Sequence, residues 1–286
     1  MQKNTAQKLT LLDAEGNEIR HTTMKLKLIT EFYEDFFTRK KDTEIQQWRG
    51  PARALTTKIT TEEVAIATAR LNNHRAKGPD ELAGELLKYG GQAIHREYAE
   101  VLNQIFERHE TIQELKEGHL IPLNKPKKPC IASNTRPLIL LAASRKVLST
   151  IVLLRIQERV GNFLSTGQHA YRSGRSATEV IWTIQWIRAT VEQYAERVRT
   201  MGIDLSKAFD CLDRTKLIEI IEEHGLATED ELRLITFLLS ETTMRINVDG
   251  ILGTSFKTII GTPQGDALSP ILFLIYLEHR RRNNDP

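Results

Sequence analysis

The sequence is poor in cysteine and has no long apolar run. Cys130 and Cys211 are the only two cysteines among 286 residues, and this spacing suits neither a zinc cluster nor a disulfide framework. The longest apolar run, residues 271–277, is far shorter than the roughly 20 residues that cross a bilayer. Residues 1–10 are polar and lack the apolar core of a signal peptide. These absences predict a soluble, intracellular protein with no membrane partner and no disulfide partner.

A strong excess of one charge is also missing. The formal net charge is +3, with 27% charged and 40% hydrophobic residues, which are ordinary values for a globular protein. The length allows one large domain or two small ones. The mild basic bias is compatible with nucleic-acid binding, but it fits a plain soluble protein equally well.

Hydrophobic periodicity predicts a helix-rich α/β (α+β) chain with a small antiparallel sheet. Helices are expected at residues 24–40, 60–71, 81–88, 92–109, 143–163, 175–196, 213–224 and 229–239, and from Ser269 onward. Strands are expected at residues 119–123, 138–141, 198–205, 245–248 and 254–260, with a short hairpin at 11–19. Asp249-Gly250 predicts a hairpin turn between the last two strands. Pro122 is expected to break the first of these strands. Residues 41–57, interrupted by Gly50-Pro51, read as a polar connector, and residues 279–286 as a polar, basic tail.

The first candidate site is a carboxylate at the end of an apolar segment, Asp204 in Ile203-Asp204-Leu205. A strand that ends on a carboxylate fixes it at a sheet edge and leaves it open to substrate. Carboxylates are ligands of Mg²⁺, and nucleotidyl transfer uses two such ions. A lone aspartate after a strand is more commonly a turn or capping residue, and Phe209 alone reads as a core aromatic. Both interpretations stay open on this segment alone.

The second candidate site is the turn Gly261-Thr262-Pro263-Gln264-Gly265. Proline fixes φ, and glycine permits close approach of the backbone to a ligand. Such a turn can lie beside a nucleotide, although the bare pattern is that of an ordinary turn. Ser269-Pro270 follows it and predicts the start of a helix.

A basic loop between two predicted strands is the third candidate. It carries Lys125, Lys127 and Lys128, and Arg136 follows. Lysine offers a point charge to phosphate and arginine a bidentate fork. This composition suits a hairpin that closes over a triphosphate, and it also suits a solvated charged loop.

Five segments, in the same order, resemble the reverse transcriptase domain of non-LTR (LINE-type) retrotransposons, over a span from about Leu11 to Glu278. They are residues 59–88 with Ala76-Lys77-Gly78-Pro79-Asp80, residues 120–126 with Arg136-Pro137-Leu138, Gln168-His169-Ala170-Tyr171-Arg172-Ser173-Gly174-Arg175-Ser176, residues 203–210, and residues 261–270. The resemblance implies an RNA-directed DNA polymerase that uses Mg²⁺ (or Mn²⁺). Its expected partners are an RNA template, a DNA primer and a dNTP.

The resemblance also implies roles for individual residues. Asp204 and the Leu205 carbonyl would bind the catalytic metals. Phe209 would act as the steric gate against a 2′-hydroxyl. The nucleotide would contact Lys125, Arg136, Gln264 and Gly265. Arg172 and Arg175 would contact the template or primer backbone, and such contacts give affinity without sequence readout.

The sequence departs from the family pattern at four places. Glu81 stands where the family usually has glycine, and Thr135 stands where it has an aromatic residue. Ile139 replaces a small hydroxyl residue, and Ala170 replaces glycine. None of these changes removes a polar catalytic residue.

One palm motif of the family, a pair of adjacent aspartates, does not occur after Glu278. The resemblance therefore divides the chain into a linker and N-terminal helix (1–57), an N-terminal extension with fingers (58–197) and a partial palm (198–286). We expect the chain alone to lack polymerase activity. The alternatives are a non-catalytic RNA-binding remnant and a retroelement fragment without a selected role.

Overall fold

The structure is a computed structural model that describes residues 9–13, 15–39, 45, 52–108, 110–195 and 197–284. Its sheet has the strand order β2-β1-β3-β4. The strands are β1 (Glu117–Asn124), β2 (Thr135–Leu141), β3 (Thr243–Val248) and β4 (Ile251–Lys257). Both hairpins are antiparallel, as predicted, but β1 runs parallel to β3. The sheet is therefore mixed and not purely antiparallel.

Pro122 does not break β1, contrary to the prediction. It lies opposite Pro137 in the β1–β2 ladder. On its other edge, β1 pairs with β3 only from Glu117 to Leu120. Proline has no N–H to donate, and a position without a ladder hydrogen bond needs none. Pro122 is therefore tolerated both opposite Pro137 and on the edge that faces β3.

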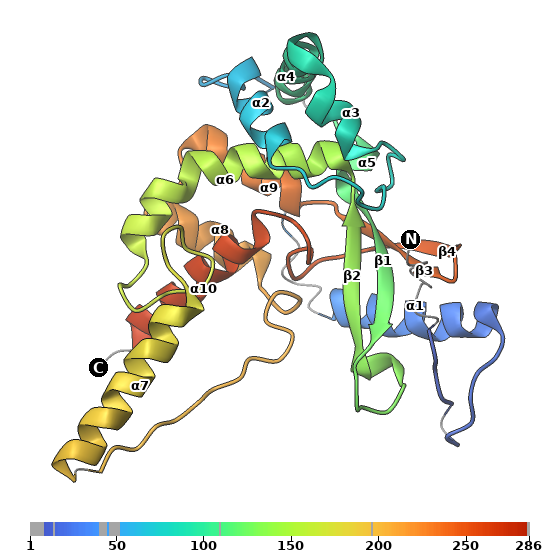
Figure 1. Cartoon of the computed structure of the whole chain (residues 1–286). Coiled ribbons are helices and arrows are strands. Elements are labelled where there is room, and N and C mark those ends of the chain that lie inside the picture. Colours follow the sequence, from blue (N-terminus) through green and yellow to red (C-terminus); the bar gives the residue numbers. More distant parts are fainter. Residues whose placement is uncertain are drawn as a thin grey trace.

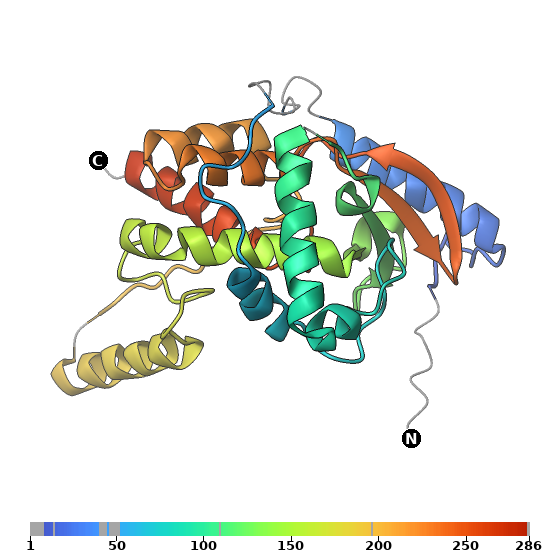
Figure 2. The ribbon, with the colours of Figure 1, turned by 90° about the horizontal axis from the view of Figure 1, so that it is seen from above.

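Helix α1 (Thr22–Thr38) packs against the sheet, on the β3–β4 side in Figure 2. Its buried side chains include Tyr33, Phe36 and Phe37, which form one apolar core with β1, β2, β3 and β4. Tyr33 Oη lies 2.7 Å from Thr135 Oγ1. Thr135, which departs from the family pattern, thus makes room for a tyrosine from α1 and binds its hydroxyl.

A second core lies among the helices around the long, central α6 (Ala143–Phe163) (Figure 1). The other helices of this layer are α2 (Thr61–Ala69), α3 (Gly84–Tyr89), α4 (Gly91–Arg108), α5 (Gln113–Lys116), α8 (Arg214–Glu223), α9 (Glu229–Leu239) and α10 (Ser269–Asn284). A 3₁₀ turn, Ala132–Asn134, precedes β2. Helix α10 extends through residues 279–284, so the polar, basic residues predicted as a tail continue this helix. Among the helices that the structure describes, none is long and apolar enough to cross a membrane.

Local signals explain several helix ends. Thr60 and Glu63 form a capping box at α2, and Asp213 accepts the Lys216 N–H at the start of α8. Thr228 and Glu231 form a second capping box at α9. Since each cap satisfies backbone donors that would otherwise lack a partner, these helices begin at the predicted positions.

The segment before α3 contains another departure from the family, at Glu81. Gly78 lies against the end of β2, where an added Cβ would come within 2.4 Å of the Leu141 backbone. Glu81, three residues later, has φ +52°. This left-handed conformation favours glycine, the residue that the family has there. The predicted helix of residues 81–88 consequently begins only at Gly84.

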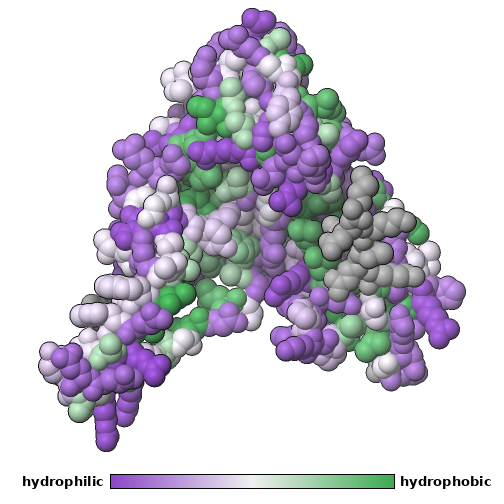
Figure 3. Space-filling view, viewed as in Figure 1, coloured by the Kyte–Doolittle hydropathy of each residue, from purple (hydrophilic) through white to green (hydrophobic). Residues whose placement is uncertain are grey.

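Helix α7 (Ala177–Tyr194) projects from the rest of the molecule and has no buried residue. The following residues, 197–206, return from its far end without regular structure (Figure 1). We call α7 and residues 197–206 the arm, and the other described residues the body. Figure 3 shows hydrophobic residues where the arm leaves the body. Exposed side chains of the arm include Trp182, Ile184, Trp186, Met201 and Ile203.

Some predictions lie wholly or partly outside the described residues. They are the N-terminal polar segment, most of the connector 41–57 with Gly50-Pro51, and Asp285. The predicted hairpin at 11–19 appears as one antiparallel bridge between Leu12 and Glu18. Cys130 and Cys211 are both free thiols.

Candidate active site

The predicted turn 261–265 packs directly on the segment that follows Asp204. The Gly261 N–H donates to the Leu212 carbonyl at 2.7 Å, and the Thr262 N–H donates to the Phe209 carbonyl at 2.8 Å. Gly261 has φ +80°, and an added Cβ would lie 2.6 Å from the Asp210 carbonyl oxygen. Only glycine permits both this conformation and this approach. Two candidate segments that are far apart in the sequence therefore form one site.

Asp210 and Gln264 make the central polar contact of this site. Gln264 Nε2 donates to both Asp210 carboxylate oxygens, at 3.1 and 3.0 Å. Burial of Asp210 raises the pKa of its carboxyl to about 6, against the opposing effects of Gln264, Lys207 and Lys125. The contact fixes the amide of Gln264. Asp210 was not among the predicted site residues, because its burial depends on tertiary packing.

Lys207 links the site to α1. Its ammonium lies 4.1 Å from the ring centre of Phe36 and 4.9 Å from that of Phe32. Burial lowers the pKa of Lys207, and the charge of Asp210 opposes that shift. The sequence predicted only a packing role for α1, and its aromatic spacing gave no sign of this contact with a cation.

Phe209 lies between two other aromatic side chains. Its ring centre is 5.2 Å from that of Phe273 on α10 and 6.2 Å from that of Tyr171. The side chain is half-buried. It packs as a core aromatic on one side and retains an exposed portion beside the site.

The predicted strand 198–205 is wrong. Residues 197–205 form no strand, and Ile203 and Leu205 are 76% and 51% exposed. Asp204 is exposed and makes no hydrogen bond or ion pair with any residue that the structure describes. Alternating apolar residues form a strand only when a neighbouring strand accepts their hydrogen bonds, and none of the described strands pairs with this segment.

Lys125 and Arg136 lie near the loop end of the β1–β2 hairpin, where residues 125–134 join the two strands. The Lys125 N–H donates to the Asn134 carbonyl at 3.2 Å, and Arg136 is opposite Leu123 in the ladder. Lys125 is close enough to Asp210 for its charge to oppose the rise in that carboxyl's pKa. The Arg136 side chain is exposed. Lys125 thus belongs to the same neighbourhood as Gln264, whereas no contact with Asp210 or Gln264 is seen for Arg136.

Arg172 and Arg175 have partners within the chain. Arg172 donates to the carbonyls of Ser165 and Gly161, at 2.8 and 2.9 Å. Arg175 lies 3.5 Å from the Glu179 carboxylate, which His169 also contacts. Both arginines hold together the loop between α6 and α7.

The buried guanidinium of Arg214 also supports the turn 261–265. Arg214 donates to the Gly261 carbonyl at 2.7 Å and also to the Leu239 and Thr258 carbonyls. Burial lowers the pKa of Arg214 to about 9. Gly265, with φ +110°, lies against β2, where an added Cβ would be 3.3 Å from the Ile139 carbonyl oxygen. The turn is therefore held by contacts on several sides.

Comparison with known proteins gives a consistent result. Residues 124–284 match the family model described as "Reverse transcriptase (RNA-dependent DNA polymerase)". The chain is 24% identical over 221 residues to the "Probable RNA-directed DNA polymerase from transposon X-element" of Drosophila melanogaster, which covers 75% of this chain. It is 22% identical over 223 residues to the "RNA-directed DNA polymerase from mobile element jockey" of the same organism, which covers 76% of this chain.

The chain spans about a quarter of the length of these two relatives, 24% of each. A third similar protein is the "Putative COX1/OXI3 intron 1 protein" of Saccharomyces cerevisiae, 26% identical over 156 residues that make up 54% of this chain and 16% of that protein. The family match includes the turn 261–265 and the segment of Asp204 and Asp210.

Proposed function

The chain belongs to the reverse transcriptase (RNA-dependent DNA polymerase) family, and from that membership we propose that it forms the fingers and first part of the palm of a non-LTR retroelement polymerase. We propose the same three regions that the resemblance implies: a linker with an N-terminal helix (1–57), an extension with fingers (58–197) and a partial palm (198–286). The observation that carries the proposal is the packing of the turn 261–265 on residues 209–212. This packing places Gln264 beside the segment that carries Asp204.

The proposed reaction is attack of a primer 3′-hydroxyl on the α-phosphate of a dNTP, directed by an RNA template. Lys125 and Arg136 would bind the triphosphate, and Gln264 with Gly265 would lie beside the nucleotide. Phe209 would exclude a ribose 2′-hydroxyl. Because Asp210 holds the amide of Gln264, it acts as a positioning residue in this scheme.

The family generally uses divalent metal ions, and Asp204 offers the carboxylate oxygen that Mg²⁺ (or Mn²⁺) prefers. Together with the Leu205 carbonyl, it would supply two oxygen ligands from an exposed segment. Bound ions of this kind activate the attacking hydroxyl and neutralise charge on the triphosphate. Two oxygen donors are few for two ions, so we expect the isolated chain to show no primer extension.

A chimera tests the proposal without relying on the isolated chain. Residues 58–284 would replace the matched segment of the jockey polymerase, and template-dependent extension of a DNA primer on RNA would be measured with Mg²⁺. The chimera should extend the primer, and Asp204→Asn should abolish extension. The matched control, Asp249→Asn in the exposed β3–β4 turn, should retain it. Equal activity of both variants would contradict the role of Asp204.

The exposed position of Asp204 favours one alternative, a binding module without catalysis. Lys125, Lys127, Lys128 and Arg136 would then bind phosphates of RNA. Counterion release makes such binding strongly dependent on salt. Affinity for a single-stranded RNA at low and high salt should fall when these four residues are changed to glutamine, and absence of binding at low salt would exclude this function.

A further inference from the structure

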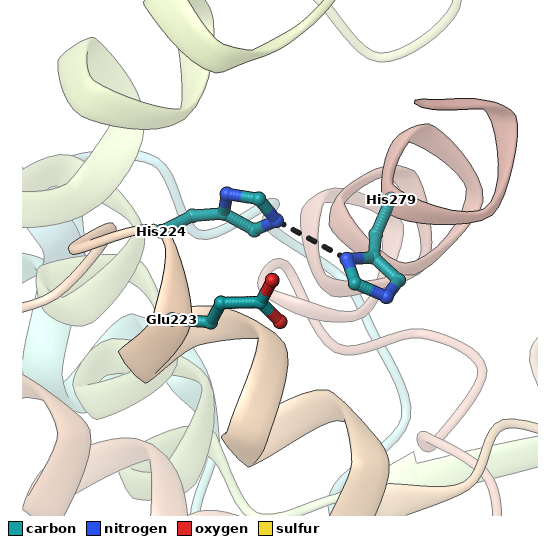
Figure 4. Close-up of side chains that lie close together, drawn as sticks. All are labelled: Glu223, His224 and His279. Atoms are coloured by element: carbon teal, nitrogen blue, oxygen red, sulfur yellow. Dashed lines mark hydrogen bonds between the residues drawn. The ribbon is translucent and has the colours of Figure 1, made fainter. Parts of the chain in front are cut away.

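Two histidines and a glutamate meet between α8 and α10, away from the contacts of Gln264. Glu223 is the last residue of α8, His224 follows it, and His279 lies on α10 (Figure 4). One ligand atom from each residue lies within 4.8 Å of the other two. This is the one such group of histidine, cysteine and acidic side chains found within the described residues. Imidazole and carboxylate together form a ligand set that Zn²⁺ favours.

The spacing of the two rings suits a shared metal ion. His224 Nε2 and His279 Nδ1 are 3.1 Å apart. Two nitrogen ligands of one tetrahedral Zn²⁺, at about 2.0–2.1 Å from the metal, lie about 3.3 Å apart. The rings are inclined at 68°, and the Glu223 carboxylate lies beside the gap between them (Figure 4). We propose that Glu223, His224 and His279 bind a Zn²⁺ ion that links α8 to α10.

Several charged residues lie around His279. Burial lowers the pKa of the His279 imidazole, as do the charges of His224, Lys216 and Arg280, while Glu223 opposes the shift. The positive charges of Lys216 and Arg280 weaken the attraction of the site for Zn²⁺. The negative charge of the Glu223 carboxylate offsets them.

Surrounding residues hold the two rings. Asn283 Nδ2 and His279 Nε2 are 2.9 Å apart. If the amide is turned so that its oxygen faces the ring, it accepts the Nε2 proton and leaves Nδ1 as the metal ligand, a common second contact of metal-bound histidine. The His224 ring lies 4.7 Å from the Phe163 ring of α6. Asn283 and Phe163 thus each contact one of the two imidazole rings.

The position of the site between α8 and α10 indicates what a bound ion would do. Helix α8 begins next to the segment of Asp210, and α10 begins just after the turn 261–265. An ion between their far ends would hold the two helices in register. Three protein ligands leave a fourth position for water, as in open zinc sites. The site is independent of the proposed polymerase function, since it involves none of the residues assigned to that reaction.

Co²⁺ substitution in the purified chain tests the site. The wild-type chain should bind one equivalent of Co²⁺ with the visible absorption bands of tetrahedral coordination, and Zn²⁺ should displace it. His279→Ala should weaken Zn²⁺ binding by more than about 100-fold, because losing a ligand costs more than losing a second-shell partner. The matched control, His21→Ala at an exposed position before α1, should bind as the wild type does.

A second variant covers the case in which His279→Ala does not fold. Glu223 is exposed, so Glu223→Gln should fold normally, as judged by circular dichroism, and should bind Zn²⁺ about 10-fold more weakly. Zinc should also raise the unfolding temperature of the wild type more than that of Glu223→Gln. Absence of the tetrahedral cobalt bands in the wild type, or unchanged bands in the folded variants, would overturn the proposal.

Discussion

The arm and the body hold the same kinds of side chain in opposite environments. Helix α7 of the arm has no buried residue, whereas every residue of α9 after Glu229 is buried. Asp204 in the arm is exposed, and Asp210, six residues later, is 2% exposed. One family motif is therefore divided between the two regions. Gln264 is already oriented by packing, whereas the proposed chemistry of Asp204 requires the arm to be ordered by further contacts.

Four matched pairs of substitutions test this contrast between the arm and the body. Each pair changes one residue type in the body and the same type in the arm, and the free energy of unfolding in urea is the common measurement. The comparison predicts a large effect in the body and little effect in the arm for every pair.

The largest difference is expected for arginine. Arg214→Met should lower the free energy of unfolding by about 4 kcal/mol, because it leaves buried carbonyls at Gly261 and Thr258 without a donor. Arg199→Met changes an exposed residue of the arm and should stay within about 0.5 kcal/mol of the wild type. A well-folded Arg214→Met protein of wild-type stability would show that this network does not stabilise the body.

Isoleucine gives the next pair. Ile235 on α9 is fully buried, and Ile184 on α7 is 59% exposed. Ile235→Ala should cost about 3 kcal/mol through lost burial and a cavity. Ile184→Ala should cost less than about 0.5 kcal/mol. A comparable loss for Ile184→Ala would mean that α7 packs against an apolar surface in solution, and the comparison of the two regions would fail.

Glycine tests the contact between the two site segments. Gly261→Ala combines strain at φ +80° with a clash against the Asp210 backbone, and it should cost about 2–3 kcal/mol. Gly202, in the arm, has no atom within 4 Å of an added Cβ, so Gly202→Ala should be nearly neutral. Tolerance of Gly261→Ala would contradict the close packing of the turn on residues 209–212.

These pairs also show which parts of the structure the sequence can predict. The helix starts at Asp213 and Ser269 and the turn at Asp249-Gly250 were correctly predicted, because caps and tight turns depend on neighbouring residues. The family resemblance predicted the candidate motifs. The strand 198–205 was wrong, because a strand depends on a partner that local alternation does not reveal.

Contacts within the site were beyond prediction for the same reason. The hydrogen bonds of Asp210 with Gln264 and the position of Lys207 over Phe36 join segments from distant parts of the chain. No local pattern specifies such contacts. The roles of Arg172 and Arg175 come from the resemblance alone, and for Arg172 the structure adds bonds to backbone carbonyls that the resemblance did not predict.

Aspartate gives the last pair, and the one whose effect depends on pH. Burial raises the pKa of Asp210 to about 6 in the folded chain, against about 3.9 in an unfolded chain. Because the unfolded state then ionises first as pH rises, stability should fall between about pH 4 and pH 6 and level off above that range. From these two pKa values, the full cost of the ionised carboxylate should be about 3 kcal/mol at pH 7.

Asp210→Asn removes this cost while keeping an oxygen that accepts from Gln264. The variant should therefore be more stable than the wild type at pH 7, and the difference should vanish below about pH 3, where the wild-type carboxyl is protonated in both states. Asp204→Asn changes an exposed side chain and should leave the pH profile of stability unchanged. Asp210→Asn could instead destabilise the chain equally at both pH values. The Asp210 carboxylate would then contribute through its geometry and not through its charge. The contrast between Asp204 and Asp210 would rest on packing alone.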